Sequence, residues 1–193
     1  NNSTKIVDVI NFNTELGDDI LNEVENEDFF KNETELKPVY IVLCSNNKKI
    51  HSKLIKKYTK SLYSHSGLAL TPELDRIYSF NVMPKVKVNG LAIDTLEEYK
   101  NTDNSGLLWV GAVFLDKKAY TRMKENIEFY VSNSDKTKYS FKNIFNILIN
   151  KPINSNYILN MICSQFVDSI LKLSNVDITG KSSNLVTPGD FIR

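Results

Sequence analysis

Two short segments that lie far apart in this chain contain residues suited to nucleophilic chemistry. Cys163 stands at the head of an apolar run with helical spacing, in Met161-Ile162-Cys163-Ser164-Gln165-Phe166. His65 stands at the head of a strand-like apolar run, in Tyr63-Ser64-His65-Ser66-Gly67-Leu68-Ala69-Leu70. Unpaired amides and the helix dipole favour a thiolate at a helix N-terminus, and an imidazole brought from a strand can accept its proton. The pair predicts a cysteine nucleophile with a histidine general base.

Each of these residues also has a purely structural interpretation. A free cysteine is often a small buried hydrophobic residue, and a histidine at a strand end is often hydrogen-bonded without a catalytic role. The other cysteine, Cys44, ends an apolar strand and is expected in the core, while His51 lies among lysines on a solvated helix face. We expect both cysteines to be free thiols, which favours a cytoplasmic or other reducing compartment.

The composition argues against several classes of function. The 193 residues include 24 basic and 23 acidic side chains, so no bulk charge attracts nucleic acid or an anionic membrane. No apolar run approaches the ~20 residues that cross a bilayer, and the histidines and cysteines fall in no zinc-ligand spacing. We therefore expect no nucleic-acid partner, no metal and no other cofactor. The lysine-rich run 48–57 is interpreted as the solvated face of an amphipathic helix, with a membrane surface as the alternative.

The expected elements mix strands and helices without regular alternation, which is typical of an α+β domain. Continuous apolar runs predict strands, and apolar residues at four-residue spacing predict helices. The second and third strands are expected to form a hairpin across 72–75, and residues 81–106 are rich in loop formers. The predicted strands cover 39–44, 66–70, 76–80 and 107–115, and the predicted helices cover 50–58, 117–131, 141–149 and 161–173.

The chain divides into an acidic N-terminal segment and a compact domain. Within residues 1–36, Leu16, Ile20 and Val24 recur at four-residue spacing, which predicts a short amphipathic helix on the outside of the main domain. The compact domain is expected to cover 37–193. We interpret residues 1–36 as a helical appendage.

Taken together, these motifs resemble the circularly permuted papain-fold cysteine hydrolases. The resemblance is to the YiiX-like branch of the superfamily that unites cell-wall amidases with lecithin–retinol acyltransferases. It implies an α+β, permuted papain-like fold in which the nucleophile helix packs against a central antiparallel sheet. The histidine motif precedes the cysteine motif, which is the permuted order. The matching segments are 63–70 and 162–167, and more loosely 38–43, 79–80 and 185–191.

The resemblance implies a role for three residues. Cys163 is the nucleophile and His65 is the general base. A polar residue on the next strand, commonly glutamate in the YiiX-like branch, orients the imidazole, and the matching position here is Ser79. A serine can hydrogen-bond the ring but brings no negative charge. Either a Cys–His dyad suffices, or Glu73 or Asp75 in the hairpin takes the role, or activity is reduced.

The function expected from these residues is that of a cysteine-dependent hydrolase, a peptidase or amidase that forms a thioester acyl-enzyme. The substrate would contain a peptide or amide group, either peptidoglycan-related or lipid-linked. One alternative is a lipid acyltransferase or esterase at a membrane surface, which requires an apolar groove beside Cys163. Another is a catalytically silent papain-fold binding or structural module, which the serine at position 79 favours. The oligomeric state is not predicted by the sequence.

Overall fold

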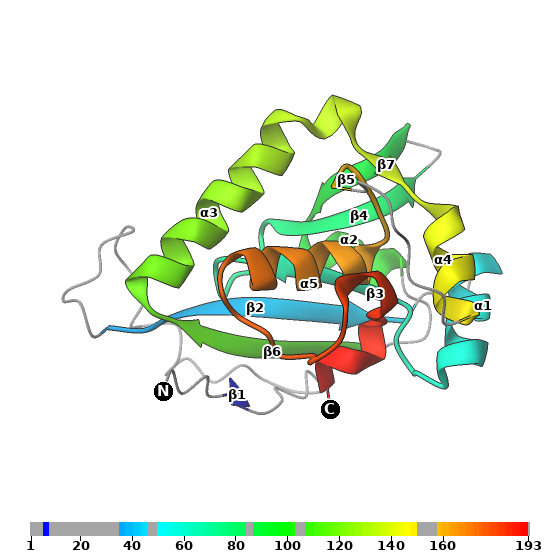
Figure 1. Ribbon diagram of the computed structural model, residues 1–193, viewed down its shortest axis with the longest axis horizontal. Coiled ribbons are helices and arrows are strands. Elements are labelled where there is room, and N and C mark those ends of the chain that lie inside the picture. Colours follow the sequence, from blue (N-terminus) through cyan, green and yellow to red (C-terminus); the bar gives the residue numbers. More distant parts are fainter. Residues whose placement is uncertain are drawn as a thin grey trace.

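The computed structural model describes residues 6–7, 35–45, 50–83, 87–102, 107–149 and 158–192. Its centre is a six-stranded sheet in the order β1-β6-β2-β3-β4-β5, and all neighbouring strands are antiparallel (Figure 1). The strands of this sheet are β1 Ile6–Val7, β2 Lys37–Cys44, β3 His65–Ala69, β4 Ile77–Met83, β5 Val88–Asp94 and β6 Leu108–Leu115. A second, parallel pair consists of β7 Lys138–Tyr139 and β8 Asn160–Met161.

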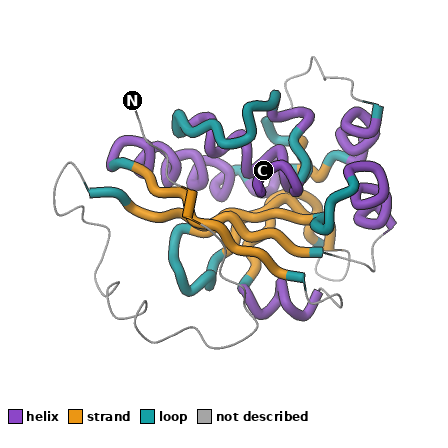
Figure 2. The backbone as a smooth tube through the Cα atoms, turned by 90° about the horizontal axis from the view of Figure 1, so that it is seen from below, coloured by secondary structure: helices purple, strands orange, loops and turns teal. Residues whose placement is uncertain are grey.

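Helices cover both faces of the sheet. Figure 2 shows α2 alone on one face, while the longer helices lie on the other. On the α5 side, Phe166 stacks on Phe80 of β4 and Tyr130 of α3, with ring centroids 5.1 and 5.2 Å apart. Burial of these large rings stabilises the packing of α5 on the sheet. The helices are α1 Ile50–Thr59, α2 Leu96–Thr102, α3 Lys117–Ser132, α4 Phe141–Leu148 and α5 Cys163–Leu173.

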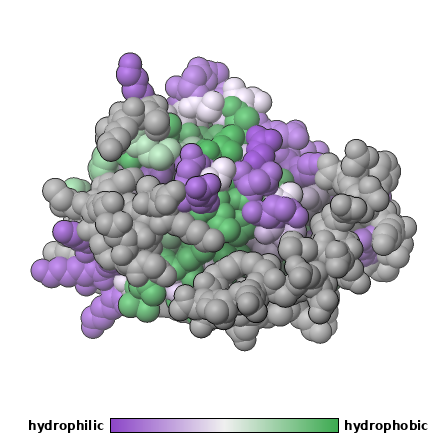
Figure 3. Space-filling model, turned by 180° about the vertical axis from the view of Figure 1, so that it is seen from behind, coloured by the Kyte–Doolittle hydropathy of each residue, from purple (hydrophilic) through white to green (hydrophobic). Residues whose placement is uncertain are grey.

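The α2 side of the sheet has a smaller core of its own. Val42, Ala69, Ile77 and Tyr99 are its buried centre. Figure 3 views the molecule from behind, where apolar side chains remain at the surface between hydrophilic ones. The sheet is therefore packed on both faces, more heavily on the face of α5.

Most of the predicted elements are confirmed within a few residues. The hairpin across 72–75 joins β3 to β4, and Leu68 pairs with Tyr78. Asp116 caps α3, because its carboxylate accepts the N–H of Ala119 at 2.8 Å. The mixed, antiparallel α+β class is therefore the observed one.

Two elements occur where the sequence suggested loops. β5 contains Gly90, whose φ of 142° suits glycine and whose added Cβ would lie 2.3 Å from Thr137 Oγ1. The short helix α2 begins after Thr95, whose hydroxyl accepts the N–H of Glu98 while the Glu98 carboxylate accepts the N–H of Thr95. This reciprocal capping box is the local signal that predicts α2.

The start of α5 also differs from the prediction. Met161 belongs to β8, and the helix begins at Cys163 itself, two residues later than predicted. The backbone N–H of Ser140 donates to the carbonyl of Met161 at 2.9 Å, so this carbonyl bonds to the segment between β7 and α4. The nucleophile candidate is consequently the first helical residue.

The helix expected around Leu16, Ile20 and Val24 lies outside the described residues, as does most of the acidic segment 1–36. The described part of that segment includes β1, which pairs with β6 through Ile6 and Val113. Within the described ranges, none of the helices has both the length and the apolar character needed to cross a bilayer.

Candidate active site

Cys163 sits in the first turn of α5, and a buried side chain fixes that turn. The side-chain oxygen of Gln165 accepts the backbone N–H of Ile162 at 3.2 Å and the amide of Asn143 at 2.8 Å. The Gln165 amide nitrogen donates to the carbonyl of Asn184 at 2.9 Å. Gln165 therefore ties the N-terminus of α5 to α4 and to the segment that follows α5.

The Cys163 thiol is enclosed, with none of the residue exposed to solvent. Burial raises the pKa of this thiol, because a thiolate loses its hydration there. The backbone and hydroxyl of Ser66 act in the opposite direction, as do the helix amides at Cys163 and Ser164. Burial is the larger effect, so the thiol is neutral in the resting protein. Both cysteines are free thiols, and Cys44 is also buried.

The contact with Ser66 brings the two sequence motifs together. Ser66 directly follows His65 on β3, and its side chain is fully buried. The first residue of α5 thus lies against the strand that begins with His65. Packing of α5 on β3 therefore brings Cys163 next to Ser66, the residue that follows His65.

The imidazole of His65 has a different neighbour. Its ring lies 5.3 Å from the ring of Tyr99 on α2, measured between centroids. Successive strand residues point to opposite faces, so the register of β3 directs Ser66 toward α5 and His65 toward Tyr99. A direct bond between Cys163 and His65 stays a prediction, which requires the imidazole to turn at the end of β3.

Ser79, the third predicted residue, is buried on the neighbouring strand β4. Its hydroxyl donates to the carboxylate of Asp94 in a long hydrogen bond of 3.4 Å. Asp94 ends β5 and is itself 5% exposed. Ser79 is thus in contact with a carboxylate from the next strand, a residue that the sequence analysis missed.

Tyr99 is the second residue that the sequence analysis missed. Its phenol is fully buried, and burial raises its pKa well above the usual value, with further increases from Cys44, Asp94 and Cys163 when these groups are ionised. The Ser79 side chain acts in the opposite direction. Tyr99 is therefore electrostatically linked to both predicted sites, the Cys163 thiol and the Ser79–Asp94 pair.

The two acidic alternatives in the hairpin are exposed. Asp75 accepts a hydrogen bond from the hydroxyl of Thr71 at 2.8 Å within the same turn. Glu73 is near Tyr40, whose pKa is raised first by burial and then by this carboxylate. Neither residue is shown in contact with His65.

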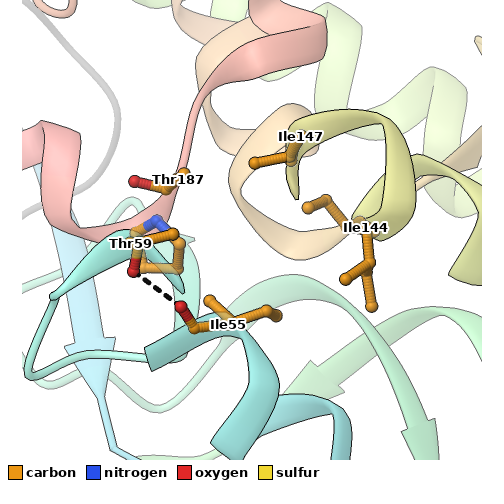
Figure 4. Close-up of a pocket in the computed structure, with 7 residues that line it drawn as sticks. Ile55, Thr59, Ile144, Ile147 and Thr187 are labelled. Carbon is orange, nitrogen blue, oxygen red and sulfur yellow. Dashed lines mark hydrogen bonds between the residues drawn. The ribbon is translucent and has the colours of Figure 1, made fainter. Parts of the chain in front are cut away.

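A small apolar pocket lies between α1, α4 and the segment after α5 (Figure 4). It includes Ile162, the neighbour of Cys163 in the chain, and its volume is about 10 Å³, which is room for a single water molecule. In α1 the hydroxyl of Thr59 donates to the carbonyl of Ile55 at 2.8 Å, which satisfies the polar group at the pocket wall. The pocket is lined by Ile55, Thr59, Ile144, Ile147, Ile162, Thr187 and Pro188.

A buried carboxylate holds one wall of this pocket. Asp190 accepts hydrogen bonds from the backbone and hydroxyl of Thr187 at 2.9 and 2.8 Å. Lys181 donates to its other oxygen at 2.7 Å. Burial acts to raise the pKa of Asp190, but the bonds from Lys181 and Thr187 outweigh it, and the pKa is lowered.

Within the residues that the structure describes, no group of three or more histidine, cysteine, aspartate or glutamate side chains is placed to hold a metal ion. The arrangement offers a buried thiol at a helix N-terminus, with the imidazole of His65 on the opposite face of β3. No protein-family model matches the chain, and no curated protein matches it.

Proposed function

We propose that this protein is a cysteine-dependent hydrolase, a peptidase or amidase with a permuted papain-like fold. Cys163 is the nucleophile and His65 is the general base. The observation that carries the proposal is the contact of the Cys163 thiol with Ser66, next to His65, at the N-terminus of a packed helix. Two segments chosen for their chemistry alone meet at that point.

The reaction begins with a neutral thiol, because burial raises the pKa of Cys163. The imidazole of His65, which packs against Tyr99 on the opposite face of β3, must first turn toward the thiol. It then removes the thiol proton as the sulfur attacks the substrate carbonyl, so the charge develops only during the reaction. The backbone N–H groups at the start of α5 stabilise the oxyanion. His65 then returns the proton to the leaving amine, and a thioester remains on Cys163. Water, activated by the same imidazole, hydrolyses the thioester and releases the acid.

The lipid acyltransferase or esterase stays an alternative for substrate screening. It requires an apolar groove beside Cys163, and the pocket that includes Ile162 has room for about one water molecule and not for an acyl chain.

A second function is supported by a specific observation. The thiol is fully buried and its pKa is raised, which is the behaviour of a structural cysteine in a binding module that has no catalytic activity.

Alkylation of Cys163 by iodoacetamide distinguishes the two functions. The rate at Cys163 is followed by mass spectrometry of peptides across a pH series, so that Cys44 stays native. For a hydrolase we expect His65→Ala to slow alkylation at pH 7 at least tenfold through loss of general-base assistance. His51→Ala, the other histidine of the chain, is the matched control. Equal rates in wild type and His65→Ala would identify a silent module.

A further inference from the structure

We propose that a second cavity, between the β3–β4 hairpin and α3, binds a free α-amino acid with an aliphatic side chain. Its volume is about 340 Å³, which is in the size range of small-molecule sites. Leu70 and Tyr78 line it from the hairpin, and Ile127 and Val131 line it from α3. The inference goes beyond the proposed hydrolase and does not depend on the reactivity of Cys163.

The cavity is separate from the candidate active site. Leu70, at its wall, follows Ser66, the residue in contact with the Cys163 thiol, by four positions along β3. At the usual rise of a strand, four residues span about 13 Å. The cavity also shares none of its lining residues with the small pocket that includes Ile162. It is therefore a second site, at the far end of β3 from Cys163.

The charged residues of the lining favour a ligand that carries both charges. The hairpin contributes Asp75 and Arg76, and α3 contributes Lys124 and Glu128, which share a helix face because they are four residues apart. These two basic and two acidic side chains sum to no net charge. A simple anion or cation is attracted by one pair and repelled by the other. An ammonium and a carboxylate on the same small molecule are both attracted.

The hairpin wall is built to hold a carboxylate. The guanidinium carbon of Arg76 lies 5.6 Å from the centroid of the Tyr78 ring, over its face. A guanidinium packed on a ring can still donate two parallel N–H bonds to a carboxylate. Asp75 already accepts the hydroxyl of Thr71 at 2.8 Å. We therefore assign the ligand carboxylate to Arg76 and the ligand ammonium to Glu128 on the facing wall.

The aromatic residues of the lining argue against a ligand that binds by stacking. Tyr78 and Tyr120 are both buried. Arg76 covers the face of Tyr78, and the Lys37 ammonium lies 5.5 Å from the centroid of the Tyr120 ring. A nucleobase binds by stacking on an open aromatic face, and neither ring offers one. The two tyrosines are therefore part of the wall and do not form a stacking platform.

The rest of the lining that contacts a ligand is aliphatic. Ile127 is buried, while Leu70 and Val131 are half-buried at the cavity. An aliphatic side chain that fills this space removes apolar surface from water on both sides of the contact. L-Leucine combines an ammonium, a carboxylate and a branched aliphatic group, so it is the probe for this site.

The first test is isothermal titration calorimetry of the wild-type protein with four small molecules. L-Leucine has all three features, whereas N-acetyl-L-leucine lacks the ammonium, L-leucinamide lacks the carboxylate and glycine lacks the aliphatic group. We expect saturable binding of L-leucine and an affinity about tenfold or more lower for each of the other three. Absence of saturable leucine binding, or equal affinities for all four molecules, would overturn the inference.

The second test places the binding in this cavity. We expect Arg76→Gln and Glu128→Gln each to weaken leucine binding about tenfold or more, through loss of one ionic contact. Arg122→Gln and Glu125→Gln make the same chemical changes on α3 at positions outside the lining, and they should leave the affinity unchanged. Equal affinities in the two lining variants and their controls would show that leucine binds elsewhere, which also overturns the inference. Arg76 and Glu128 are exposed, so their replacement leaves the core intact.

Discussion

The thiol of Cys163 lies against Ser66, so the nucleophile candidate touches the residue that follows the candidate base. Ser66 is fully buried and points toward α5. Its backbone and hydroxyl favour the thiolate, while burial opposes it. A substitution at Ser66 is therefore a way to change the reactivity of Cys163 without altering His65.

Replacing Ser66 by alanine removes the hydroxyl that lowers the pKa of Cys163. We expect the pKa of the thiol to rise further, and the pH profile of Cys163 alkylation to move to higher pH. Because the Cys163 thiol stays buried, the direction of this pKa shift follows from the lost polar contact alone. The measurement is the pH at half-maximal alkylation, with Ser64→Ala on the same segment as the control. A profile that moves to lower pH would contradict the assignment.

A methyl group at position 67 collides with the partner of His65. Gly67→Ala places a Cβ 2.4 Å from the Tyr99 hydroxyl and 2.5 Å from Ile77 Cγ2. We expect a loss of about 1–3 kcal/mol in the free energy of unfolding, as for other overpacked interiors. Urea denaturation measures it.

A double variant shows whether the Tyr99 hydroxyl carries part of this cost. Tyr99→Phe removes one of the two colliding atoms and leaves the other. The loss in Gly67→Ala with Tyr99→Phe should therefore be smaller than the sum of the two single losses. If the losses of the two single variants were strictly additive, the Tyr99 hydroxyl would not be in steric conflict with the Cβ at position 67.

The elements that hold Cys163 and His65 were largely predictable from the sequence. Continuous apolar runs around Val39–Cys44 and Leu108–Leu115 form central strands, because burial on both faces requires apolar residues at every position. The Cys163 helix was predicted because apolar residues recur on its buried side. Its first residue was misplaced, since the apolar Met161 and Ile162 match the helical pattern although they precede the helix.

The part of the site that was missed lies in β5 and α2. Gly90 and Asn89 are residues typical of loops, so the sequence of β5 predicts a loop. In the structure Gly90 lies within the strand, where the close approach of Thr137 requires a glycine. The seven residues of α2 are mostly polar, and among its described side chains, at 96–99, the buried one is Tyr99. Periodicity detects an apolar stripe, and a single buried tyrosine provides none. The contact of Ser79 with Asp94 depends on the register of β4 with β5, which no local pattern specifies.

The segment after α5 is expected to lose stability in acid through Asp190. Its pKa is lowered from 3.8 in the folded protein, despite the opposing effect of burial, because Lys181 and Thr187 donate hydrogen bonds to it. A group with a depressed folded pKa contributes stability above its unfolded pKa and loses it as the pH falls through the folded value.

Asp190→Asn tests this contribution. We expect it to lower the free energy of unfolding at pH 7 by about 1–2 kcal/mol, a value reduced by the partial exposure of Lys181. The difference from wild type should shrink as the pH falls from 3.8 through the lower folded pKa of Asp190, where the folded wild-type carboxylate also becomes protonated. Urea denaturation at a series of pH values measures this. A difference that stays constant into that range would show that Asp190 contributes through its shape and not its charge.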